Sequence, residues 1–153
     1  MTSLALAGAL RSLPQGKLDM LPYGRLLDIG FARVGGEVVL TMPYAERLIG
    51  TPGRLHGGSI AGLLELAALA GVIVALPGDA PLPRIRPVTI TVDFMREGAL
   101  RDTQAAAEIT RLGRRIVIVS VRAWQNLDGE CCRNRPIAGA HVNFLLDYPA
   151  VPV

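Results

Sequence analysis

The chain has 153 residues, of which 50% are hydrophobic and 19% charged, a composition that excludes a disordered protein and allows a substantial core. The net charge of +3 is too small to favour nucleic-acid binding, and no basic run carries interleaved aromatic residues. Arginine supplies nearly all of the positive charge, because Lys17 is the only lysine. We expect one domain over residues 1–153.

The first 42 residues indicate a short helix and a pair of strands. Residues 3–12 favour a helix, which Pro14 and Gly16 would end. A signal peptide would have a basic residue before its apolar stretch, and this segment has none. Apolar residues alternate through 24–34, which predicts a strand. The Gly35-Gly36 turn then leads to a second predicted strand over 37–42, so the two strands should form a hairpin.

An apolar segment follows a loop rich in glycine and proline. It opens with His56-Gly57-Gly58, and between Ser59 and Leu76 its only ionisable side chain is Glu65. Such a segment is either a buried helix or a membrane span. We expect a buried helix and no membrane partner, because alternating strands come next and an open sheet cannot lie in lipid.

The remaining chain alternates as strands. The patterns predict strands over residues 86–95, 103–111, 115–125 and 137–146. In the first of them, Val88, Ile90, Val92 and Phe94 share one face. Short turns between most of these strands predict an antiparallel sheet, so the fold class is α+β, with one long helix against one sheet.

The two cysteines argue against a disulfide framework. Cys131 and Cys132 are adjacent in a polar loop, a spacing that rarely forms a bridge, and we expect a reduced, cytoplasmic protein. With only His56 and His141 besides these cysteines, no zinc-binding spacing exists. We therefore expect neither a metal nor a redox cofactor.

Several motifs now resemble one family, the PaaI-type acyl-CoA thioesterases of the hot-dog fold. They are Gly53, the His56-Gly57-Gly58 opening with Glu65 nine residues after its histidine, Val88-Thr89, the run from Asp93 to Arg96, and the Leu112-Gly113-Arg114-Arg115 turn. The resemblance covers about 24–147 and implies one central helix wrapped by a curved six-stranded antiparallel sheet. Gly50 departs from the pattern, because the family commonly has asparagine there to help place the thioester or the water.

The resemblance implies hydrolysis of an acyl-CoA thioester. Glu65 would act as base or nucleophile, and the N–H of Gly57, or of Gly58, would polarise the carbonyl, as a helix N-terminus can. His56 would orient the thioester. The resemblance further implies a homodimer in which the acid of one subunit faces the His-Gly-Gly of the other, with a dimer of dimers as the larger assembly.

Each site residue also has a plainer interpretation. Glu65 could pair with an arginine across an interface, His56 could cap the helix, and the two glycines could simply suit the helix start. Ser59 could contact substrate but better fits a capping residue. The predicted hairpin tip carries a cluster made up of Arg111, Gly113, Arg114 and Arg115. These residues could simply be exposed to solvent, or the arginines could bind the phosphates of CoA.

Three other functions stay open. A hot-dog protein could bind acyl-CoA without efficient turnover, which Gly50 favours. A related lyase would need an Asp/His pair of the hydratase kind, which the sequence does not present. A purely structural oligomer would have an empty, closed subunit interface. The acyl group also stays open, because side chains from two subunits would shape the pocket.

Overall fold

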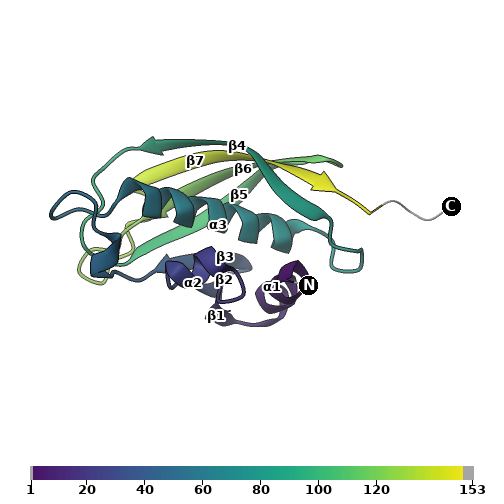
Figure 1. Cartoon of the computed structure of the whole chain (residues 1–153), viewed down its shortest axis with the longest axis horizontal. Helices are drawn as coiled ribbons and strands as arrows, with labels where there is room; N and C mark the ends of the chain where they lie inside the picture. Colours follow the sequence, from purple (N-terminus) through teal and green to yellow (C-terminus); the bar gives the residue numbers. More distant parts are fainter. Residues whose placement is uncertain (1, 150–153) are drawn as a thin grey trace.

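The computed structural model describes residues 2–149 and shows a curved sheet wrapped around one long helix, α3 (Figure 1). The sheet is antiparallel, with strand order β1-β2-β3-β5-β6-β7-β4. Its strands are β1 (Gln15–Lys17), β2 (Gly30–Val34), β3 (Glu37–Met42), β4 (Arg84–Phe94), β5 (Thr103–Leu112), β6 (Ile116–Trp124) and β7 (Ala138–Asp147). The helices are α1 (Thr2–Ser12), α2 (Pro22–Leu26), α3 (Gly57–Ala75) and the 3-10 helix η1 (Glu46–Leu48).

The predicted α+β hot-dog architecture is confirmed, but the prediction of six strands is wrong, since the sheet has seven. The additional strand, β1, pairs antiparallel with β2, so that Gly16 lies opposite Phe31. A Cβ at residue 16 would lie 2.8 Å from the Phe31 ring, so glycine lets β1 lie close over that ring. In the sequence this glycine indicates only the end of a helix and gives no sign of the strand.

The prediction of one strand across 24–34 is also wrong, because its first part is helical. Pro22 begins α2 at a position where its missing N–H is no loss. Asp28 then takes a positive φ of 54°, which reverses the chain before β2 starts at Gly30. Leu27 and Ile29 are nevertheless buried. The alternation therefore identifies residues that face the core, although these residues do not lie in a strand.

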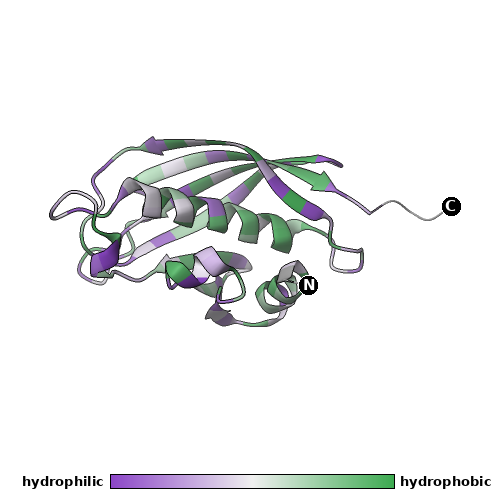
Figure 2. Cartoon of the chain, viewed as in Figure 1, coloured by the Kyte–Doolittle hydropathy of each residue, from purple (hydrophilic) through white to green (hydrophobic). Residues whose placement is uncertain are grey.

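Helix α3 forms the centre of the core. The inner face of β6 packs against it through Val117, Val119 and Val121, while α1 covers another side with Leu6 and Leu10. By length and composition α3 could span a membrane, yet over half of the residues in its most apolar 18-residue stretch are buried in this fold. Figure 2 shows α3 hydrophobic along most of its length, as expected for a helix that protein covers on several sides.

A smaller cluster lies on the outer face of the sheet, where Trp124 is buried with Val39 and Ala106. Arg133 covers it from the loop before β7, with its guanidinium 4.9 Å from the Trp124 ring centre, and pairs with Glu37. Hydrogen bonding to Glu37 raises the pKa of Arg133. The loop before β7 therefore covers Trp124 within the single chain.

Candidate functional site

The start of α3 is shaped by His56, which occupies the N-cap position. Its Nδ1 accepts a hydrogen bond from the Gly58 N–H at 2.9 Å, which requires the neutral ring with its proton on Nε2. Its carbonyl accepts the Ser59 hydroxyl at 2.7 Å and the Ser59 N–H at 3.0 Å. Ser59 is buried, and in this arrangement it holds the helix start.

These bonds leave one backbone donor of the first turn open. The N–H groups of Gly58, Ser59 and Ile60 all bond to His56, the last one at 3.4 Å. Among the described residues no acceptor bonds the Gly57 N–H. Helix N-termini carry unsatisfied donors and a partial positive charge, so this N–H can receive an oxygen that carries developing negative charge.

The open N–H borders a cleft of about 340 Å³. The cleft is lined by Arg54, Leu55, Gly57, Ile60, Phe94, Met95, Arg96, Glu97 and Gly98. A Cβ at residue 57 would lie only 3.3 Å from the tip of the Phe94 ring, so glycine keeps the backbone accessible beside it. Phe94 belongs to the Asp93–Arg96 motif, but its place beside Gly57 follows only from how β4 runs past α3.

Gly50 lies against the same histidine. The Gly50 N–H donates to Arg54 O at 3.0 Å and the His56 N–H to Leu48 O at 2.7 Å, which folds 48–56 into a tight loop. A Cβ at residue 50 would lie 2.9 Å from the His56 Cα. Glycine thus allows this loop to close on His56, and an asparagine here would displace backbone.

Glu65 lies two turns further along α3 and is half-buried. No described residue forms a hydrogen bond or an ion pair with its carboxylate, so no arginine of the same chain neutralises it. Ala61, Glu65 and Leu69 recur at every fourth position and are only half-buried, whereas the residues on the sheet side of α3 are buried. Glu65 therefore marks the side of α3 that the chain leaves uncovered.

Strand β4 leaves an apolar face uncovered as well. The register confirms the predicted alternation for Ile90, Val92 and Phe94, which pair with Val142, Ala140 and Ala138 on the inner face of the sheet. Val88 does not follow it, because a register shift between Pro87 and Thr89 leaves this residue without a partner on β7. Ile90 and Phe94 are nevertheless 39% and 57% exposed. As β4 is also an edge strand, the molecule presents an open sheet edge beside an apolar face.

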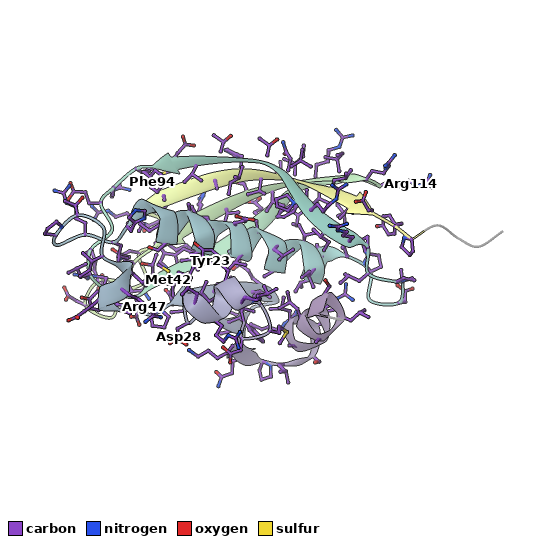
Figure 3. The ribbon with its side chains drawn as sticks, in the orientation of Figure 1. Tyr23, Asp28, Met42, Arg47, Phe94 and Arg114 are labelled. Carbon is purple, nitrogen blue, oxygen red and sulfur yellow. The ribbon has the colours of Figure 1, made fainter. Side chains whose placement is uncertain are left out.

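The arginine cluster of the β5–β6 hairpin lies at the other end of the sheet. Ile116 pairs with Leu145 next to the Arg84 end of β4, whereas Phe94 pairs with Ala138 at the opposite end. The 11 residues of β4 separate the two ends by on the order of 30 Å, and Figure 3 labels Phe94 and Arg114 far apart. Within one chain, Arg111, Arg114 and Arg115 therefore do not meet Gly57.

Gly113 has a backbone role at that hairpin. Its N–H donates to Ile116 O at 2.9 Å, and a Cβ on it would lie 2.6 Å from the same oxygen. The arginines around it are exposed beside a depression of about 440 Å³. No group of three or more metal-ligating side chains occurs in the described part of the chain.

Comparisons with known proteins agree with this fold. A family model described as the acyl-CoA thioesterase N-terminal domain matches residues 49–145. A search of curated proteins finds no match. Among solved structures, a thioesterase family protein from Silicibacter pomeroyi is similar with TM-score 0.76 and 21% identity, covering 94% of this chain and 99% of its own.

Two further solved structures are similar over nearly their whole length. One, from Ralstonia eutropha, is described as a putative thioesterase and phenylacetic acid degradation-related protein, with TM-score 0.70, 17% identity and coverage of 92% and 98%. The other, a protein from Chromobacterium violaceum, has TM-score 0.70, 26% identity and coverage of 96% and 99%.

Proposed function

Because the chain belongs to the acyl-CoA thioesterase family of hot-dog proteins, we propose that it hydrolyses an acyl-CoA thioester to a free acid and CoA. The observation that carries the proposal is the N–H of Gly57, which has no acceptor among residues 2–149 and borders an open cleft at the start of α3. A thioester carbonyl bound there would gain a hydrogen bond that strengthens as its oxygen becomes negative. Gly58 is the weaker candidate, because His56 already accepts from its N–H.

The base of this reaction is Glu65, and it acts on a carbonyl held by a second copy of the chain. Gly57 and Glu65 are eight residues apart on one helix, which separates them by about 12 Å and prevents both from reaching one carbonyl carbon. Two antiparallel copies of α3, related by a twofold axis near Ala61, would oppose Gly57 of one copy to Glu65 of the other. Each dimer would then hold two sites.

The uncovered surfaces support this dimer. The exposed inner face of β4 and the half-buried stripe of Ala61, Glu65 and Leu69 lie on the side that a partner would cover. Pairing β4 with its own copy would also remove the open sheet edge. The same antiparallel pairing would carry the partner's arginine-rich end toward Gly57, where guanidinium groups can bind the phosphates of CoA. A dimer of dimers is the larger assembly that we propose.

In the reaction, a water oxygen bonds to the carbonyl carbon and its proton passes to Glu65. The carbonyl oxygen becomes negative and accepts from the Gly57 N–H. When the carbonyl re-forms, the bond from carbon to sulfur breaks, and the proton on Glu65 passes to the sulfur of the leaving CoA. His56 holds the helix start and thus the orientation of the Gly57 N–H.

Thiol release from a panel of short-chain, long-chain and aryl CoA thioesters tests the proposal. Glu65→Gln keeps the size of the side chain and removes its charge, and it should lower kcat by ~100-fold or more, as expected for a lost general base. Glu108→Gln, on the exposed outer face of β5, is the matched control and should leave turnover unchanged. Equal turnover by the Glu65 variant and wild type would show that the carboxylate is structural.

One other function has an observation in its favour, namely binding of acyl-CoA without efficient turnover. Gly50 supplies no polar side chain to the site, and the loop closes on His56 where such a side chain would begin. Saturable CoA binding by a protein that releases no thiol from any of the thioesters would identify the chain as a binding member of the family.

A further inference from the structure

Tyr23 reaches from α2 onto the backbone of α3. A Cβ at Gly62 would lie 2.5 Å from the phenol oxygen and 2.6 Å from Cε1 of Tyr23, so the ring edge occupies the space that a side chain at residue 62 would need. Figure 3 shows Tyr23 between α2 and α3. Gly62 is buried by this contact, whereas Tyr23 itself is 44% exposed. The hydroxyl group thus rests on the central helix, while part of the tyrosine is exposed to solvent.

The place where it rests is next to Glu65. Residues three apart on a helix are neighbours on one face, with about 5–6 Å between their Cβ atoms, and Gly62 and Glu65 stand in this relation. Tyr23 therefore packs on the helical neighbour of Glu65, beside the half-buried stripe of Ala61, Glu65 and Leu69. Neither the Tyr23 hydroxyl nor the Glu65 carboxylate forms a hydrogen bond with any other described residue, and a phenol hydroxyl in such a place normally finds a partner.

We propose that the Tyr23 hydroxyl is a further catalytic group, which holds the attacking water together with Glu65. This inference rests on the proposed thioesterase activity. The water would donate one hydrogen to the Glu65 carboxylate and the other to the Tyr23 oxygen, which leaves a lone pair directed at the carbonyl carbon. On attack Glu65 takes the proton, while Tyr23 keeps its own proton and only fixes the position of the water.

The loop at Gly50 leaves room for a contribution from α2. A water bonded only to Glu65 could rotate freely, so a second protein group is needed to direct it. Gly50 has no side chain, His56 uses its Nδ1 to cap the helix, and the Ser59 hydroxyl donates to His56. Tyr23 is a polar side chain that packs directly on Gly62, the helical neighbour of Glu65.

Two substitutions test this role from opposite sides. Tyr23→Phe removes only the hydroxyl, and Gly62→Ala places a methyl group where the ring edge lies. The ring is exposed and can swing away, and alanine is favoured over glycine in a helix by about 1 kcal/mol, so the Gly62 variant should fold. Both variants should lower kcat by about 3- to 10-fold, the value of one hydrogen bond between neutral groups, with KM unchanged.

Tyr44→Phe is the matched control, because Tyr44 is similarly exposed, at 37%, and lies in the loop after β3 away from α3. It should retain wild-type kcat. Full turnover by Tyr23→Phe would overturn the proposal. Loss of activity in Tyr23→Phe together with full activity in Gly62→Ala would overturn it too, because displacement of the ring should also remove the hydroxyl from the water.

A measurement without turnover separates this inference from the proposed activity. In NMR spectra, Glu65→Gln should shift the ring resonances of Tyr23 and leave those of Tyr44 in place. Unchanged Tyr23 resonances would overturn the inference whatever the enzyme does. A wild-type protein that releases no thiol would instead refute the thioesterase proposal and with it the attacking water, even where the resonances of Tyr23 shift.

Discussion

The C-terminal end of α3 is closed by a side chain, whereas its N-terminal end keeps one polar group open. At the C-terminal end Arg11 donates to Ile73 O at 2.8 Å and 3.1 Å, to Leu76 O at 3.0 Å and to Pro77 O at 3.4 Å. At the N-terminal end the donors of residues 58–60 bond to His56, and only the Gly57 N–H remains without an acceptor among the described residues.

The two ends of α3 therefore have different roles: the C-terminal end contributes to stability, and the N-terminal end is available for binding. A guanidinium at a helix C-terminus satisfies orphan carbonyls and interacts favourably with the helix dipole, and here it also ties α1 to the core. An open N–H at the other end contributes nothing to the folded chain alone, so its value lies in what it can bind. Changes at the two ends should therefore affect different measurements.

The largest expected effect is on activity and comes from Gly57→Pro. Proline removes the N–H yet suits the first position of a helix, and the preceding His56, with φ −66° and ψ 130°, already has the backbone that proline requires. The variant should fold with nearly wild-type stability and lose about 100- to 1,000-fold in kcat, as does removal of an oxyanion donor.

Gly57→Ala is its control, because alanine keeps the N–H and introduces the same Cβ near Phe94. Comparing thiol release by the two variants isolates the hydrogen bond from the added bulk. If the proline and alanine variants are equally active, the Gly57 N–H does not stabilise the transition state. The N-terminal end of α3 then has no catalytic role.

At the opposite end, Arg11→Met should reduce stability and spare activity. Methionine keeps an apolar stem but leaves the half-buried carbonyls of Ile73 and Leu76 without their donor, which should cost about 1.5–3 kcal/mol. For a chain of this size that corresponds to a fall of roughly 3–12 °C in Tm. Thermal unfolding followed by circular dichroism measures the change.

Arg25→Met provides the comparison for that experiment. Arg25 is exposed on α2, and within the described residues its guanidinium makes no hydrogen bond or ion pair. Its substitution should leave Tm nearly unchanged. Equal Tm values for the two variants would mean that water satisfies the end of α3 as well as Arg11 does.

The sequence could predict those parts of the site that depend on neighbouring residues. The His56-Gly57-Gly58 opening and the single acid at Glu65 locate the helix start and the ionisable group of α3, and both are on one element. The sequence does not indicate the role that we propose for Tyr23, because the 24–34 alternation predicts a strand where α2 begins at Pro22. Local pattern does not show that this helix packs on α3.

Other features of the site depend on strand order. The motifs that contain Glu65 and Arg114 do not by themselves show that the β5–β6 hairpin and Gly57 lie at opposite ends of the sheet. Similarly, the alternation in β4 indicates an apolar face, but only the edge position of β4 leaves Phe94 uncovered. Both features depend on contacts between distant segments and, for the dimer that we propose, on a second chain.

The smallest expected effect concerns His56, whose two roles a pair of substitutions can separate. His56→Ala removes the acceptor for the Gly58 N–H and should cost about 1 kcal/mol of stability, the usual value of an N-cap. His56→Asn restores a short acceptor and should recover that stability in urea unfolding. If the imidazole only caps α3, the asparagine variant also recovers turnover, because the Gly57 N–H regains its orientation. If the imidazole orients the thioester, stability returns while thiol release stays low, and the open end of α3 then includes His56 as well as Gly57.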